Sequence, residues 1–242
     1  MTTHLLCRMH MIILPLVLLL PLSLGCGSIR KDKRQDFLKP FASVAPSGER
    51  GHSQTIPSDY TLCVETAKTV AALGHAEEAI KLYEHAETLD SAAPSLDSQL
   101  APLYASLGDY FAAIARYQLC TAQSPDDVEL CNNFAWTLME AGQFKQAIAE
   151  ANRGLQINNH HTRLQATLAM IHYQQGDDAK ALQGFERAHG PIAAHHNLSL
   201  LDIDSGNLES AKDHLQIARQ SPETNGQAEV MLTALEAQTS TH

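Results

Sequence analysis

The sequence contains thirteen histidines, whose imidazole groups can bind metal or transfer protons near neutral pH. None stands in a ligand spacing such as H-E-x-x-H, and no Cys-x-x-Cys pair is present. We therefore predict no metal site and no cofactor, and we expect the C-terminal histidines to lie at the surface in loops. That group comprises His160, His161, His189, His195 and His196.

Catalytic motifs are also absent from the sequence. It contains no G-x-S-x-G nucleophile elbow, no phosphate-binding loop and no paired carboxylates at a distinctive spacing. We therefore predict no catalytic residues, no enzyme activity and no small-molecule substrate.

Composition and charge narrow the class of partner. Hydrophobic residues make up 44 % of the 242 residues, which is enough to bury a core. The 17 Lys and Arg are outnumbered by 27 Asp and Glu, whereas nucleic-acid binding needs a basic face. The balance therefore argues against nucleic acid as a partner.

The N-terminus is almost wholly apolar from residue 11 to residue 24, with the sequence MIILPLVLLLPLSL. This length is typical of a signal-peptide core and is short of the roughly 20 residues that span a bilayer. The run ends in LSLGC, which resembles the lipobox of bacterial lipoproteins. The resemblance implies a signal peptide over residues 1–25 and lipid on Cys26, because two or three acyl chains give stable anchoring.

The residues that follow Cys26 indicate where in the cell the protein is expected. The resemblance implies a cell-envelope protein, and Gly27 in place of an aspartate favours the outer membrane, facing the periplasm. The basic cluster at residues 30–34 keeps open an alternative, an uncleaved N-terminal anchor. Residues 26–59 are rich in Lys, Ser, Gly, Pro and Gln, and they are typical of a flexible tether.

A repeat begins where the tether ends. Glycines recur at a spacing of 34 residues, and a fifth follows after 30: Gly74, Gly108, Gly142, Gly176 and Gly206. Five residues after each glycine comes an alanine: Ala79, Ala113, Ala147, Ala181 and Ala211. Glycine suits a tight turn between helices, small residues let helices approach closely, and stacked helix pairs bury faces that one pair cannot.

These residues resemble the tetratricopeptide repeat, a helix–turn–helix unit of 34 residues. The resemblance implies an all-α fold, a right-handed α-solenoid of five units over residues 60–225. The units would cover 60–93, 94–127, 128–161, 162–191 and 192–225, with a capping helix and tail over 226–242. The chain departs from the family in lacking its early tryptophan, and Pro102 should kink the first helix of the second unit or delay its start.

In this family the first helices of successive units line a concave groove that binds partner proteins. Carried over position by position, the resemblance implies a partly apolar groove: Asn132, Trp136, Met139, Arg163, Met170, Tyr173, His196 and Leu200. Such residues would suit a partner helix or extended peptide. The alternative is that Trp136 packs inside the core. The basic clamp with which some members hold a carboxylate is not present as a set.

Three cysteines fall within the repeats: Cys63, Cys120 and Cys131. They could be buried thiols, or Cys120 and Cys131 could form a disulfide in an oxidising periplasm.

Taken together, the sequence predicts a lipid-anchored scaffold for protein partners at a bacterial membrane. The layout resembles lipoproteins that assist pilus or secretion-pore assembly. The alternatives are an adaptor for other envelope assembly, such as cell wall or outer membrane, and an enzyme regulator.

Overall fold

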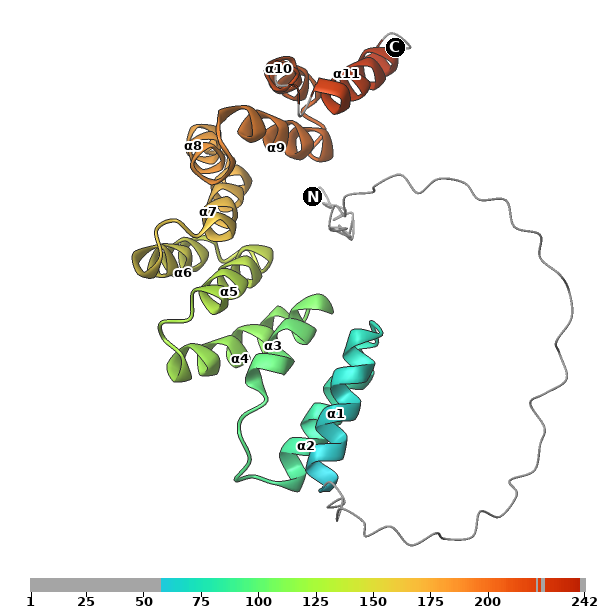
Figure 1. The fold of residues 1–242 in the computed structure, drawn as a ribbon, viewed down its shortest axis with the longest axis vertical. Helices are drawn as coiled ribbons and strands as arrows, with labels where there is room; N and C mark the ends of the chain where they lie inside the picture. The colour runs from blue at the N-terminus through green and yellow to red at the C-terminus, as the bar shows by residue number, and fades with distance from the viewer. Residues whose placement is uncertain (1–57, 221, 223–224, 240–242) are drawn as a thin grey trace, which may run out of the picture. The chain divides into compact units, whose positions relative to one another are not determined.

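The computed structural model describes residues 58–220, 222 and 225–239. Within this part the chain forms eleven α-helices and no strand (Figure 1). In chain order they are α1 (Asp59–Ala72), α2 (Ala76–Leu89), α3 (Asp97–Ser106), α4 (Tyr110–Gln123), α5 (Val128–Glu140), α6 (Phe144–Ile157), α7 (Thr162–Gln174), α8 (Asp178–His189), α9 (Pro191–Asp204), α10 (Leu208–Ala218) and α11 (Asn225–Thr239).

The helices pack in the order of the chain. Each odd-numbered helix from α1 to α9 packs against the helix that follows it, and each pair packs against the next pair. Helix α11 packs against α10 and closes the series. This arrangement confirms the predicted all-α solenoid of helix pairs with a C-terminal capping helix.

The turns inside the pairs share one backbone conformation. The five repeat glycines all have positive φ: Gly74 at 86°, Gly108 at 76°, Gly142 at 72°, Gly176 at 76° and Gly206 at 78°. Their amide groups bond to carbonyls of the helix that has just ended, as at Gly108, whose N–H donates to Ala105 at 3.0 Å. Residues that carry a Cβ are strained at positive φ, whereas glycine is not, so the glycine period sets the period of the turns.

Small residues bring the two helices of each pair together. The alanines five positions after the repeat glycines are all fully buried: Ala79, Ala113, Ala147, Ala181 and Ala211. Contact is closest where even alanine would not fit. A Cβ added at Gly184 in α8 would lie 2.7 Å from Cβ of Ala169 in α7. Small side chains therefore set the spacing of the helices, and larger side chains fill the space beside them.

Two prolines mark departures from the regular repeat. Helix α3 contains Pro102 and is 10 residues long, whereas the other first helices have 13 or 14. Pro191 is the first residue of α9, where its missing N–H and fixed φ suit a helix start. Gly190 alone, with φ of 86°, separates α8 from α9.

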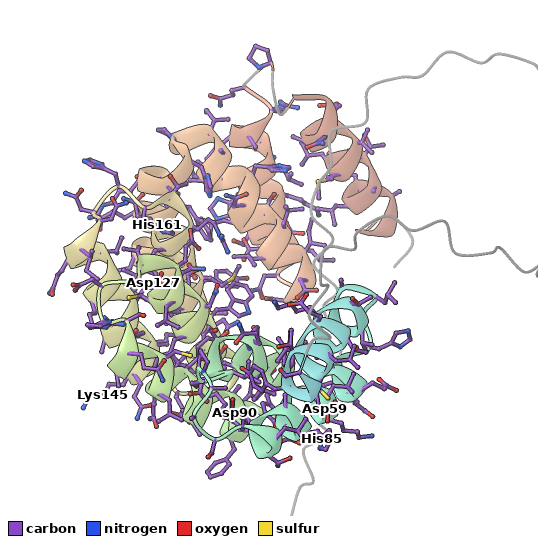
Figure 2. All side chains as sticks on the ribbon, turned by 60° about the horizontal axis from the view of Figure 1, so that its bottom comes forward. Asp59, His85, Asp90, Asp127, Lys145 and His161 are labelled. Carbon is purple, nitrogen blue, oxygen red and sulfur yellow. The ribbon has the colours of Figure 1, made fainter. Side chains whose placement is uncertain are left out.

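Side-chain caps fix the starts of α5 and α7, whereas α3 and α9 have none. Asp127 accepts a hydrogen bond from the Leu130 amide at 3.0 Å at the start of α5. His161 accepts one from the Leu164 amide at 3.2 Å at the start of α7. Both capping residues are labelled in Figure 2. Because such caps satisfy amide groups that the helix leaves unbonded, they define where successive first helices begin.

Candidate functional site

All eight predicted groove residues lie on α5, α7 and α9, the first helices of three successive pairs. We call the side of these helices that carries them the first-helix face, and define it by Trp136, Arg163, Met170, Tyr173, His196 and Leu200. Helix α5 packs directly against α7. Polar side chains also join α5 to α7 and α7 to α9, so the three helices present their residues as one surface.

Two polar links accompany the apolar contact between α5 and α7. The Thr167 hydroxyl donates to Oδ1 of Asn132 at 2.8 Å, and both side chains are buried. Nearer the helix starts, Glu129 accepts from Nη1 of Arg163 at 3.0 Å, and its other oxygen lies 2.9 Å from Nε2 of His161. Asn132 is therefore engaged inside the protein, whereas Arg163 stays at the surface with its side chain 67 % exposed.

The contact between α7 and α9 centres on a buried carboxylate. Asp202 is only 4 % exposed and accepts from the Tyr173 hydroxyl at 2.8 Å and from the Ser210 hydroxyl at 2.7 Å. Nε2 of His214 lies 3.7 Å from the same carboxylate. Burial, together with the Asp202 charge, raises the pKa of Tyr173 and keeps its hydroxyl as a donor.

The apolar part of the first-helix face is partly buried. Trp136 and Met170 pack against the central core cluster while each keeps some exposed surface, and Leu200 is 44 % exposed. Trp136 therefore combines the two interpretations that the sequence allowed, because one part of its side chain contacts the core and another part reaches solvent. Such half-buried aromatics are favoured anchors in protein interfaces.

Met139 corrects the predicted set of groove residues. Its side chain is 1 % exposed and belongs to the central core, so it is not available to a partner. Helix α5 packs against α4, α6 and α7, which leaves little of its surface free. Positions carried over from a repeat family do not take into account how many helices surround α5 in this chain.

The histidines also differ from the prediction. His195 and His196 lie inside α9, not in a loop, and both are partly buried. Nδ1 of His195 is 2.7 Å from Nδ1 of His214 in α10, with the ring centres 4.9 Å apart. Nδ1 of His196 is buried without a hydrogen-bond partner. Burial lowers the pKa of both α9 histidines, and His214 lowers that of His195 further.

Two of the three cysteines, Cys120 and Cys131, are buried thiols, and Cys63 is partly buried. All three are free in the structure, which agrees with the first of the two alternatives and not with a disulfide between Cys120 and Cys131. Burial raises the pKa of Cys131 to about 11 and also raises that of Cys120. Both groups are therefore protonated at neutral pH, when thiols are poor nucleophiles and poor metal ligands.

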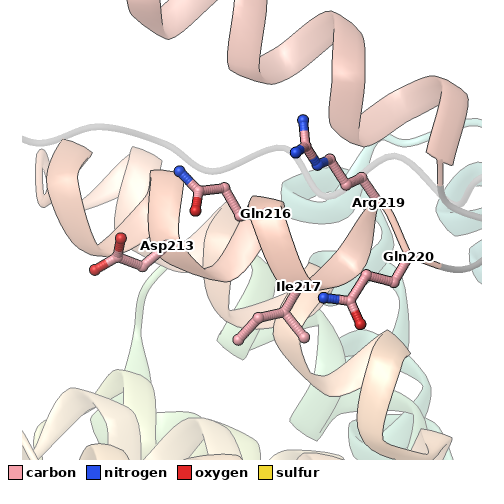
Figure 3. Close-up of a pocket in the computed structure, with 5 residues that line it drawn as sticks. All are labelled: Asp213, Gln216, Ile217, Arg219 and Gln220. Atoms are coloured by element: carbon pink, nitrogen blue, oxygen red, sulfur yellow. The ribbon is translucent and has the colours of Figure 1, made fainter.

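Among the residues that the structure describes, no three His, Cys, Asp or Glu side chains are grouped closely enough to hold a metal ion. A pocket on α10 is lined by residues of a single segment: Asp213, Gln216, Ile217, Arg219 and Gln220 (Figure 3). Arg219 lies 3.8 Å from Glu229 of α11. Its lining contains one carboxylate, Asp213, and no His, Cys, Ser or Thr that could act beside it as a base or nucleophile.

The N-terminal predictions lie outside the described residues. They are the signal peptide over 1–25, lipid on Cys26 and nearly all of the tether over 26–59. Across residues 58–220 and the described part of α11, no helix has both the length and the apolar character needed to cross a membrane.

The groove prediction missed a second set of exposed apolar residues. Phe111 in α4 is 88 % exposed, and Leu73 and Leu107 beside the turn glycines are 70 % and 46 % exposed. The repeat register contained a signal for Phe111. It stands three residues after its glycine, where the other units have Glu77, Lys145, Ala179 and Glu209.

Comparison with known proteins identifies the repeat. The model of the tetratricopeptide repeat family matches residues 104–157 and 138–188. No curated protein gives a significant match to the sequence.

Solved structures share the fold at low sequence identity. A tetratricopeptide repeat protein from Parabacteroides merdae ATCC 43184 aligns with a TM-score of 0.58 and 16 % identity, over 74 % of this chain and 73 % of that one. MamA from Desulfovibrio magneticus RS-1 aligns with a TM-score of 0.55 and 16 % identity, over 68 % of this chain and 95 % of that one. A thermophilic tetratricopeptide repeat protein from Thermus thermophilus aligns with a TM-score of 0.51 and 17 % identity, over 74 % of this chain and 99 % of that one.

At such identities the structural likeness shows the fold alone, while the match of the family model rests on the sequence itself. The structural likeness and the family-model match agree with each other and with the regular spacing of the glycines and alanines. Residues 104–188 of this chain match the tetratricopeptide repeat model, and its helix pairs have the fold of solved tetratricopeptide repeat proteins.

Proposed function

We propose that the chain is a non-enzymatic scaffold that binds a peptide or helix of a partner protein on its first-helix face. The tetratricopeptide repeat fold is a scaffold for protein–protein interaction, which supplies the general class. The observation that carries the proposal is the half-buried apolar strip of Trp136 and Met170, continued by the exposed Leu200.

The chemistry of the face fits an amphipathic partner. Trp136 and Met170 offer apolar contact area on side chains that the core already holds in place, so ordering them costs little. Arg163 and Glu129 pair at the edge of the face, where both are largely exposed. An apolar centre with a polar, solvent-accessible edge is the usual organisation of a protein interface.

The N-terminal residues supply the proposed location. The apolar run, the LSLGC ending and the polar residues after it support a lipid-anchored protein of the bacterial envelope, tethered through Cys26, with pilus or secretion-pore assembly as its proposed task. In this proposal the anchor is in the outer membrane and the repeats face the periplasm. An adaptor for cell-wall or other outer-membrane assembly uses the same layout, and identification of the partner distinguishes the two.

A pull-down from cells tests the face. Leu200→Asp places a charge on the exposed part of the first-helix face without disturbing the core, because Leu200 is 44 % exposed. Leu119→Asp is the matched control, since Leu119 is 51 % exposed on α4 and outside the face. We expect Leu200→Asp, Trp136→Ala and Met170→Ala to release a partner that Leu119→Asp retains. If all three variants keep every partner, the face is not the binding site.

Metabolic labelling with palmitate tests the anchor. We expect the full chain to incorporate the label and Cys26→Ser to lose it, because the thiol is the proposed attachment point. Separation of inner and outer membranes then tests the location. Unlabelled protein, or a label that survives in Cys26→Ser, would show that the chain is not a lipoprotein anchored at this cysteine.

A further inference from the structure

Exposed apolar side chains are concentrated at one end of the described chain. Of the residues that the structure describes, nine large hydrophobic ones are strongly exposed, and six of these lie between the start of α1 and the end of α4. These six are Leu62, Leu73, Leu89, Leu107, Phe111 and Leu119. Single exposed apolar residues are ordinary on protein surfaces, but a group of them indicates an interaction site.

Three of the six lie at the turns inside the first two helix pairs. Leu73 and Leu107 directly precede Gly74 and Gly108, and Phe111 is the second residue of α4. Helices in such a stack alternate in direction, so the α1–α2 turn and the α3–α4 turn lie at the same end of their pairs (Figure 1). The three side chains therefore belong to one end of the first two pairs.

Negative charge surrounds these side chains. Glu77 occupies the same place in the first unit that Phe111 occupies in the second, and Glu78 follows it. Both carboxylates are exposed, as is Asp109 at the start of α4. In the third unit the equivalent residue is Lys145, so the acidic character ends there.

The few cations nearby leave this charge largely uncompensated. Residues 58–127 contain eleven Asp and Glu, and their Lys and Arg are Lys68, Lys81 and Arg116. Lys68 is paired with Glu65, and Arg116 is paired with two carboxylates of α2 and α3. An excess of exposed carboxylates raises the local concentration of cations and cationic partners.

We propose that this end of the first two pairs is a second docking site, which binds a cationic amphipathic segment of a partner protein. We call it the turn-end surface, and it consists of Leu73, Glu77, Glu78, Leu107, Asp109 and Phe111. Phe111 is the apolar anchor, and the three carboxylates pair with Lys or Arg beside the partner's apolar side chains.

Charge decides among the possible occupants. A second copy of the same acidic surface would bring like charges together, which opposes self-association through this end. An anionic membrane surface is repelled for the same reason. A cationic amphipathic segment satisfies both the apolar and the acidic part of the surface, and its binding is independent of the first-helix face.

A synthetic peptide tests the site. The probe is a fluorescein-labelled Leu/Lys amphipathic helix of about four turns, with a Leu/Glu peptide of equal length as its counterpart. We expect fluorescence anisotropy to show binding of the Leu/Lys peptide, weakened at least about tenfold by Phe111→Ser. Val230→Ser is the matched control, because Val230 is 70 % exposed on α11, and it should leave the affinity unchanged.

Charge variants complete the test. Glu77→Gln with Glu78→Gln should weaken binding and flatten its salt dependence, whereas Asp204→Asn with Asp213→Asn should change neither. Equal affinities for the Phe111→Ser and Val230→Ser variants would overturn the proposal, since the peptide would then bind by diffuse charge alone. The proposal is also overturned if Phe111→Ser instead abolishes dimerisation in sedimentation, or abolishes binding to zwitterionic vesicles.

Discussion

Two buried carboxylates, one near each end of the stack, are stabilised by different chemistry. Asp97 and Asp202 are each 4 % exposed. Asp97 at the start of α3 is 2.8 Å from Nη1 of Arg116, which also binds Glu87 of α2. Asp202 of α9 has two hydroxyl donors, Tyr173 and Ser210, and the imidazole of His214. Asp97 also accepts from the Ser95 hydroxyl, so the two sites differ in their remaining partners: Asp97 has a permanent cation, whereas Asp202 has a second hydroxyl and an imidazole.

The difference separates the two regions in their response to pH. Arginine remains charged across the physiological range, and the bonds to Glu87 and Asp97 raise the pKa of Arg116 despite the opposing effect of burial. In α7 and α9, by contrast, burial lowers the pKa of His172, His195 and His196. The α2–α4 junction should therefore be insensitive to mild acid, whereas the α7–α10 region should respond to it.

Loss of Arg116 should have the largest effect. Arg116→Ala leaves Asp97 buried without its cation, and removal of one partner of a buried pair costs about 3 kcal/mol of the free energy of unfolding. Urea denaturation measures this cost. The control is Arg219→Ala, because Arg219 and its partner Glu229 are 52 % and 59 % exposed and such pairs contribute less than about 1 kcal/mol. Equal costs for the two variants would contradict the claim that the buried Arg116 pair contributes more to stability than the exposed Arg219 pair.

Loss of the Tyr173 hydroxyl should have a smaller effect. Tyr173→Phe removes one donor from Asp202 but leaves Ser210 in place, so we expect a cost of about 1–2 kcal/mol. Tyr60→Phe removes an exposed hydroxyl bond, 3.3 Å long, to the Pro94 carbonyl and should cost less. Urea denaturation of the two variants compares them, and a larger cost for Tyr60→Phe would contradict the assignment of Asp202 as the buried centre.

Mild acid should destabilise the C-terminal region. Burial lowers the pKa of His172, His195 and His196, so the unfolded chain takes up protons before the folded chain does. Their contribution is complete above the unfolded pKa of about 6.5 and is lost as the pH falls towards the lower folded values. Hydrogen exchange at two pH values should show α7, α9 and α10 losing protection while α1–α4 keep theirs, after correction for the intrinsic pH dependence of exchange.

A variant identifies the group responsible. His195→Gln removes the close contact with the His214 ring and should give a thermal unfolding midpoint that depends less on pH than that of the wild type. A stability that increases on acidification, or that decreases equally in both regions, would contradict the comparison.

The turn glycines should show no difference between the two regions. Gly108 and Gly206 have φ of 76° and 78°, and a Cβ added at either meets no atom within 4 Å. Replacement by alanine therefore costs only the strain of a Cβ at positive φ, about 1–2 kcal/mol of the free energy of unfolding in each case. Unequal costs in thermal unfolding would show that the two turns are not equivalent.

The repeat chemistry explains what the sequence could and could not predict. The all-α solenoid followed from glycines and alanines in register, because turn conformation and close helix packing each restrict the residue type at one position. Burial of Met139 could not be derived in this way, since it depends on three helices surrounding α5. The partners of Asp202 in α9 come from α7 and α10 and share no spacing rule. Phe111 was accessible from the sequence, because an aromatic stood where other units have charged or small residues.

Site-specific photo-crosslinking in cells tests the central claim most directly. A photoreactive residue is placed at Leu200 on the first-helix face and, in a separate strain, at Leu119 on α4, two positions of similar exposure. Binding on the first-helix face predicts a discrete crosslinked protein at position 200 and none at position 119. Crosslinks at 119 without any at 200 would contradict it.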